Sequence, residues 1–139
     1  MVKVSLVLLT FNRYEAVAAT FPVNVANAGY PIHEIIHVDN GSFPENCKKL
    51  RKLIPANIRV EHSENQGVSK GYNRGMVLAT GSHVCITGCD RILPENWLKD
   101  WVSSLEKIPN TGVISIYTPP EEKWEPRLRG SKENINGID

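Results

Sequence analysis

The sequence lacks the features that mark membrane, secreted and nucleic-acid-binding proteins. No apolar run reaches the roughly 18 residues needed to span a bilayer, so no transmembrane helix is predicted. The N-terminus runs directly into a strand pattern without a small-residue cleavage site, so no signal peptide is predicted. With 16 Lys and Arg against 15 Asp and Glu, the formal net charge is +1, and charge alone indicates neither a nucleic-acid partner nor a membrane surface.

Cysteine is scarce. The three cysteines, Cys47, Cys85 and Cys89, are odd in number and sparsely spaced, which argues against a disulfide framework and against a zinc site. They are expected to be ordinary buried or half-buried thiols, and a reducing cytoplasm is the expected location.

Two common phosphate-binding motifs are absent. There is no Gly-x-x-x-x-Gly-Lys-Ser/Thr, which excludes a P-loop, and the spacing of Gly67, Gly71 and Gly75 does not match the dinucleotide fingerprint. Glycines four residues apart on a helix favour close packing against a sheet, and this is expected of Gly71 and Gly75. Gly67 lies in a turn, where approach of the backbone to a ligand is more plausible.

The sequence does contain an alternation of strand and helix patterns. Hydrophobic residues make up 41% of the chain, enough for the core of one domain. Apolar runs predict five strands, at residues 4–9, 34–38, 58–61, 83–87 and 113–117. Periodic segments between them predict four helices, at residues 14–28, 44–54, 69–79 and 94–105. This order predicts an α/β, Rossmann-like fold with a parallel sheet and right-handed crossovers.

The turn after the second strand determines how the chain continues there. Asn40-Gly41 is typical of a hairpin, but Ser42 and Glu45 have the spacing of a capping box and Pro44 suits a first helical turn. The segment is therefore predicted to be a strand-to-helix turn.

After Tyr117 the sequence becomes polar and rich in proline. Residues 1–118 are predicted to form the core, and residues 119–139 a tail or the truncated start of a further region. The late acids have no context that marks a general base, so none is assigned from Glu121, Glu122, Glu125, Glu133 and Asp139.

Two aspartates follow predicted strands. Ligands of open parallel sheets bind outside the carboxyl ends of the strands, where Asp39 and Asp90 are both expected. A carboxylate at that edge can accept a hydrogen bond from a base or ribose, or can bind a hard cation. The alternative is that each aspartate only caps the turn that follows it. His33 and His37, on one side of a strand, have no evident third ligand for a metal.

Four blocks of the sequence together resemble family 2 glycosyltransferases, especially rhamnosyltransferase-like members. They occur in the family's order at residues 4–13, 35–42, 65–75 and 87–90. The resemblance implies the GT-A fold, a mainly parallel sheet with helices on both faces, and transfer of a sugar from a nucleoside-diphosphate donor, commonly UDP- or dTDP-linked, with inversion. The acceptor would be a saccharide, a lipid-linked group or a protein; the oligomeric state is not indicated.

The resemblance also implies roles for individual residues. Asp39 would accept a hydrogen bond from the base, and Asp90 would bind a divalent metal, Mn²⁺ or Mg²⁺, that bridges the diphosphate. Gly88 stands where the family carries the first aspartate of its Asp-x-Asp motif, so a catalytically inactive nucleotide-sugar-binding module is the alternative. An unrelated receiver-like domain is disfavoured because the first loop has no acids. The expected nucleotide-binding residues are Thr10, Asn12, Arg13, Asp39, Asn40, Gly67 and Lys70.

Overall fold

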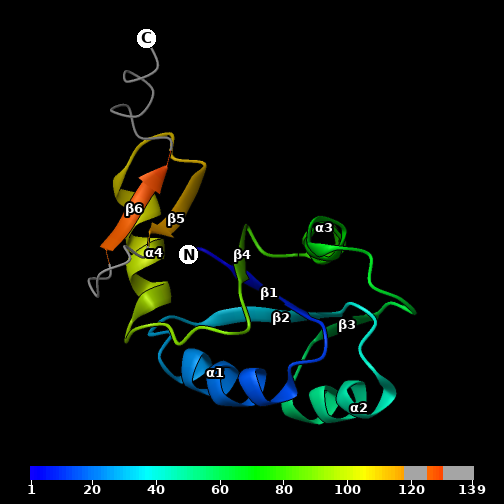
Figure 1. Cartoon of the computed structure of the whole chain (residues 1–139). Coiled ribbons are helices and arrows are strands. Elements are labelled where there is room, and N and C mark those ends of the chain that lie inside the picture. Colours follow the sequence, from blue (N-terminus) through cyan, green and yellow to red (C-terminus); the bar gives the residue numbers. More distant parts are fainter. Residues whose placement is uncertain (118–124, 130–139) are drawn as a thin grey trace. The chain divides into compact units, whose positions relative to one another are not determined.

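A computed structural model of the protein describes residues 1–117 and 125–129 (Figure 1). The chain forms two compact units, Met1–Glu95 and Asn96–Asp139. Within the described ranges, no helix is both long enough and apolar enough to cross a bilayer.

The first unit is built on a parallel sheet of four strands in the order β3-β2-β1-β4. The register pairs Thr10 with Asp39, Asp39 with Glu61, and Leu8 with Thr87, so all four strands end at one edge. The strands are β1 (Val4–Thr10), β2 (Ile32–Asp39), β3 (Ile58–Glu61) and β4 (His83–Thr87).

Helices cover both faces of this sheet. Helix α1 (Tyr14–Ala26) contacts α2 (Pro44–Leu53), and both lie on one face, whereas α3 (Val68–Leu78) packs on β1 and β2 from the other (Figure 1). The predicted α/β fold with a parallel sheet is confirmed, and the four strands differ from prediction only at their ends.

The face beneath α3 is apolar and tightly packed. Val7, Leu9, Ile36 and Val38 alternate along β1 and β2 and form a buried cluster. Gly71 and Gly75 are buried against this cluster, and a Cβ on either would collide with the side chain of Leu9 or Val7. The predicted close-packing role of these two glycines is confirmed.

Gly75→Ala is expected to destabilise the protein by about 1–3 kcal/mol, because Val7 is fully buried, stiff at χ1 and has no space to yield. Urea unfolding measures the change, with the exposed neighbour Arg74→Ala as the control that should stay near wild type. An equal effect of the two substitutions would contradict the packing argument.

The opposite edge of the sheet holds a buried carboxylate. Glu34 accepts hydrogen bonds from Ser5 Oγ at 2.5 Å, Thr80 N at 2.6 Å and Thr80 Oγ1 at 2.9 Å. Burial favours the neutral acid, but these hydrogen bonds outweigh it and lower the pKa of Glu34. The group therefore ties the end of α3 to β1 and β2.

The second unit contains α4 (Trp97–Lys107), β5 (Val113–Tyr117) and β6 (Glu125–Arg129). The prediction that the fifth strand would join the parallel sheet is wrong, because β5 pairs antiparallel with β6, a strand that the sequence pattern did not reveal. The predicted division at residue 118 stays a prediction, since residues 119–124 and 130–139 lie outside the described residues.

One predicted helix cap and one predicted helix start are wrong, although α2 does begin at the predicted Pro44. The capping box is not formed: Phe43 is the N-cap of α2, without a side-chain cap, and Ser42 Oγ instead accepts a hydrogen bond from Asn12 N at 2.7 Å. Helix α4 begins at Trp97 rather than at Pro94, after Asn96 with φ of 62°. At α2 a contact of Ser42 with the first loop replaces the capping box, and at α4 the backbone turn at Asn96 delays the start of the helix.

Candidate functional site at the carboxyl ends of the strands

A chain of hydrogen bonds links three strands at the edge where they end. Thr10 Oγ1 lies 2.8 Å from His37 Nε2 and 3.1 Å from Asp39 Oδ2, and Arg59 donates to His37 Nδ1 at 2.8 Å. Arginine is only a donor, so Nδ1 must be the unprotonated nitrogen and Nε2–H donates to Thr10. Thr10 can then donate to Asp39, which gives one consistent direction from Arg59 to the carboxylate.

His37 is held neutral in this chain. It is 1% exposed, and its pKa is lowered to about 4, first by burial and then by the Arg59 charge, against the opposing effect of Asp39 and Glu61. Arg59 is itself anchored by the carbonyl of Ile54 at the end of α2. The metal-pair interpretation of His33 and His37 finds no support, because the described residues hold no group of three metal-binding side chains.

Asp39 is committed to the turn that follows it. Its Oδ1 accepts from Gly41 N at 3.2 Å and Ser42 N at 2.7 Å, while Oδ2 accepts from Thr10. The residue is 1% exposed. The structure thus displays the turn-capping arrangement, and contact between Asp39 and a base remains a prediction.

Asn12 fastens the first loop to the second. Its side-chain Oδ1 accepts from Phe43 N at 2.9 Å and Asn46 Nδ2 at 3.2 Å. Both Asn12 and Arg13 have φ of 54°, an uncommon conformation for residues other than glycine. Strained backbone of this kind gathers at functional sites, and here it precedes α1 at the sheet edge.

Arg13 reaches the segment that follows β4. Its Nη1 lies 3.4 Å from Asp90 Oδ2, and the two side chains are 65% and 52% exposed. An ion pair this exposed contributes little to stability, about 0–1 kcal/mol. It does show that charges of opposite sign, from the loops that follow β1 and β4, meet at this edge.

Polar residues of α1 hold the segment that carries Asp90. Thr20 Oγ1 donates to Cys89 O at 2.8 Å, Asn24 Nδ2 donates to Arg91 O at 2.9 Å, and Asn24 Oδ1 accepts from Leu93 N at 2.7 Å. Both side chains are buried. Thr20 and Asn24 were not predicted to have this role; the signal in the sequence was two polar residues one helical turn apart on an otherwise apolar face.

Tyr72 is a third residue at this edge that the sequence did not indicate. Its hydroxyl donates to Thr87 O at 3.2 Å, and its pKa is raised by burial and by the nearby Cys89 and Asp90.

The few possible metal ligands around Asp90 suit a metal ion whose other ligands are phosphate oxygens of the bound nucleotide and water. Gly88 adds no ligand, and no cluster of three His, Cys, Asp or Glu side chains occurs among the described residues. Mg²⁺ commonly takes one or two carboxylates and fills its remaining positions with phosphate oxygens and water. A half-exposed Asp90 fits that pattern as a single protein ligand.

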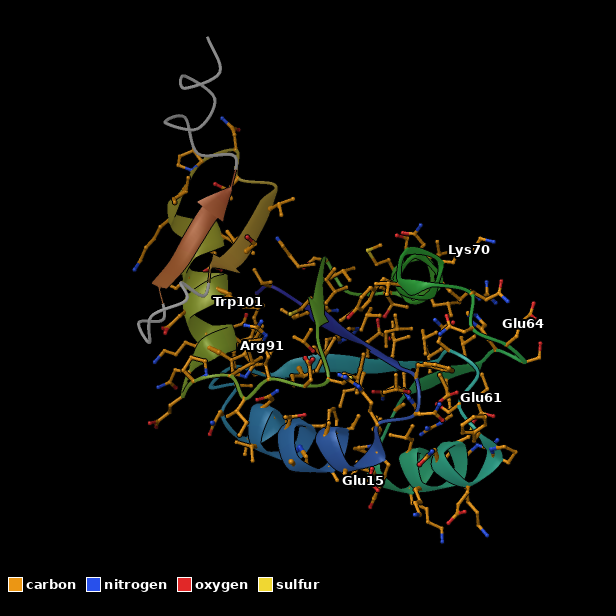
Figure 2. The ribbon with its side chains drawn as sticks, viewed as in Figure 1. Glu15, Glu61, Glu64, Lys70, Arg91 and Trp101 are labelled. Carbon is orange, nitrogen blue, oxygen red and sulfur yellow. The ribbon has the colours of Figure 1, made fainter. Side chains whose placement is uncertain are left out.

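Asn40 and the loop before α3 complete the edge. Asn40 is buried and hydrogen-bonded to residues of the loop 62–67. Gly67, with φ of 83°, is exposed just before α3, and Lys70 is exposed in the first turn of α3 (Figure 2). A Cβ on Gly67 would meet open space, so its φ rather than packing favours glycine there.

Two further predictions concern the cysteines and the late acidic residues. The three cysteines are free, as predicted, and burial raises the pKa of Cys85 to about 12. Glu125 lies in β6, whose side chains are not described, and the other acids considered as a general base, Glu121, Glu122, Glu133 and Asp139, lie outside the described residues.

Comparisons with known proteins identify the family and agree with the fold. A family model described as "Glycosyl transferase family 2" matches residues 5–137. The mannosyltransferase PcManGT from Pyrobaculum calidifontis, solved with GDP-Man and Mn²⁺, has a TM-score of 0.69 and 22% identity over 87% of this chain and 37% of its own. S. aureus TarS 1-349 has a TM-score of 0.61 and 20% identity over 76% of this chain and 32% of its own. No curated protein sequence matches. The chain thus spans about a third of the length of these two structures.

Proposed function

Because the chain belongs to glycosyl transferase family 2 and has the GT-A fold, we propose that it binds a nucleoside-diphosphate sugar at the carboxyl edge of its sheet and takes part in transferring that sugar. The observation that carries the proposal is the convergence of Thr10, Asp39, Arg13 and Asp90 at one edge, through the Arg13–Asp90 ion pair and the Thr10–Asp39 hydrogen bond. Open α/β sheets bind ligands at this edge.

The nucleoside is proposed to lie over the ends of β1 and β2. Thr10 and Asp39 end β1 and β2, Asn12 and Asn40 lie in the loops that follow, and Asn12 ties these two loops together. The ribose and diphosphate would then extend towards Gly67 and Lys70 at the start of α3. Lys70 is exposed, so its ammonium group is available to a phosphate.

The diphosphate is proposed to be neutralised by Arg13 and by a divalent cation, Mn²⁺ or Mg²⁺, with Asp90 as its protein ligand. When bound, such an ion would stabilise the negative charge on the departing nucleoside diphosphate. Arg13 can add a fixed charge from the same edge, which is useful where Gly88 leaves the metal with one carboxylate. The proposal includes inversion at the anomeric carbon of the transferred sugar. No general base for the acceptor hydroxyl is assigned among the described residues.

A binding module without turnover is the second candidate. Gly88 favours it, because the position offers no side chain to a metal. The donor is proposed to be UDP- or dTDP-linked; PcManGT was solved with GDP-Man, so GDP belongs in the same test. The acceptor, the rhamnosyltransferase-like character and the cytoplasmic location stay predictions.

Titration with UDP, dTDP and GDP, each with and without Mn²⁺, tests the donor site. Binding to the folded protein raises the melting temperature by mass action, so at least one nucleotide should raise it, and by more with Mn²⁺. A melting temperature unmoved by every nucleoside diphosphate would overturn the proposal. Hydrolysis or transfer from matching donors would separate an enzyme from a binding module.

Asp90→Asn is expected to remove the Mn²⁺-dependent part of nucleotide binding and to leave stability within about 1 kcal/mol of wild type, because the ion pair it breaks is exposed. Calorimetric titration of the best nucleotide, with and without Mn²⁺, measures the difference. Glu15→Gln, an exposed acid in the first turn of α1, is the control. Metal dependence that survives in Asp90→Asn would remove Asp90 from the site.

A further inference from the structure

Asn40 is a buried amide whose hydrogen-bonding capacity is filled within the protein. It is 2% exposed. Its Nδ2 donates to Asn65 Oδ1 at 3.0 Å and to Gly67 O at 3.1 Å, and its Oδ1 accepts from His62 Nδ1 at 3.1 Å and Gln66 N at 3.0 Å. An amide has two donor hydrogens and two acceptor lone pairs, so all four are used by the loop 62–67.

The residue after Asn40 brings the backbone of the same loop close. Gly41 has φ of 87°, and a Cβ there would lie 2.6 Å from Glu64 C and 2.9 Å from Asn65 N. The loop can approach the β2–α2 turn this closely only because Gly41 has no side chain. Asn40 thus holds the loop 62–67 by hydrogen bonds, and Gly41, the next residue, leaves the space that the loop backbone needs.

The hydrogen bonds continue to the start of α3. Asn65 Oδ1 accepts from Gly67 N at 2.8 Å as well as from Asn40, and Gly67 is the N-cap of α3. The position of Gly67 is therefore set from both its amide and its carbonyl by a network that begins at Asn40. Glu64 of the loop and Lys70 in the first turn of α3 are exposed and point to solvent (Figure 2).

We infer that Asn40 is a positioning residue, which acts on donor binding by fixing the loop 62–67 and Gly67 rather than by touching the nucleotide. The inference rests on the proposed donor site. It replaces direct contact by Asn40, because a ligand would have to displace one of four internal hydrogen bonds of a buried side chain. Since Gly67 and Lys70 are proposed to lie beside the ribose and diphosphate, the loop's influence should not depend on the base.

Asn40→Ala and a matched control test this role. The substitution should weaken binding of UDP and GDP at least tenfold each and leave their affinity ratio unchanged, because misplaced loop groups lose contacts common to both. Amide hydrogen exchange of Gln66 and Gly67 should become faster. Asn57→Ala is the control: Asn57 Oδ1 accepts from Ile35 N at 2.8 Å near the opposite edge, so this substitution should lower the melting temperature without changing nucleotide affinity.

Asn40→Asp provides a second variant if alanine prevents folding. Aspartate keeps the acceptors for His62 and Gln66 but cannot donate to Asn65 or Gly67, so exchange should quicken at Gly67 and not at Gln66, with both nucleotides weakened equally. Unchanged affinities, or loss for one base alone, would overturn the inference. If the wild-type protein binds no nucleoside diphosphate, the proposed function fails, while the exchange of Gln66 and Gly67 still reports whether Asn40 fixes the loop.

Discussion

Asp39→Ala is expected to lower the free energy of unfolding by about 3–5 kcal/mol, the largest loss from one side chain at this edge. The carboxylate is buried and accepts hydrogen bonds from Gly41 N, Ser42 N and Thr10 Oγ1. Alanine leaves these donors without their charged acceptor, and a buried donor that loses its acceptor costs about 1–3 kcal/mol. Chemical denaturation at pH 7 measures the change.

Asp39→Asn separates the charge from the hydrogen bonds. Asparagine keeps an oxygen for Gly41 and Ser42, and its amide can donate to Thr10, whose hydroxyl also accepts. We therefore expect a loss of about 1 kcal/mol, while Glu64→Ala, an exposed acid, should change little. Equal destabilisation by alanine and asparagine would contradict the turn-capping role.

The same comparison bears on donor binding. Asp39 holds Ser42, and Ser42 Oγ holds the backbone of Asn12 beside Arg13. Asp39→Ala should therefore abolish nucleotide binding at temperatures where the variant is folded. If Asp39→Asn retains binding, the aspartate acts through the turn; if it loses binding while folded, direct contact with the base is favoured.

Between pH 7 and pH 4 the protein is expected to lose about 3 kcal/mol of stability through His37 alone. The unfolded histidine has a pKa near 6.5 and the folded one about 4. Across this window the unfolded state binds more protons, so the stability is complete above pH 6.5 and is lost as the pH falls towards 4. Protonation must break the chain, because Nδ1 can no longer accept from Arg59.

His37→Gln isolates this contribution. The variant should be less stable at pH 7, and its stability should fall less steeply between pH 6.5 and 4, which urea unfolding at a series of pH values measures. His33→Gln, an exposed histidine of the same strand, should keep the wild-type pH dependence. The lowered pKa of Glu34 and Glu61 adds losses mainly below this window. Parallel profiles for wild type and His37→Gln would exclude His37 as the source.

The two largest effects arise from one hydrogen-bonded chain. Arg59, His37, Thr10 and Asp39 lie on three neighbouring strands, so protonation of His37 should also disturb the turn that Asp39 holds. Nucleotide affinity is accordingly expected to fall together with stability below pH 6.

The order of the elements in the first unit, and the edge of the sheet at which the polar residues gather, could be predicted from the amino-acid pattern alone. Apolar runs of β1 and β2 and the glycines of α3 are local patterns whose period reflects burial, so they could be read without a structure. Parallel strands share one edge, so the meeting of Asp39 and the Asp90 segment with the first loop also followed from element order.

The hydrogen-bond partners of these residues became known from the folded arrangement and not from the sequence. Each of these contacts joins residues that are distant in sequence. The loop 62–67 satisfies the hydrogen bonds of Asn40, and Arg59 donates to His37. Thr20 and Asn24 hold the segment that carries Asp90. The pairing of β5 with β6 could not be predicted either, because an apolar run indicates a strand but does not specify which strand pairs with it. Local pattern determines the type of an element, whereas its exact ends and the hydrogen-bond partners of its buried polar groups are set when the elements pack.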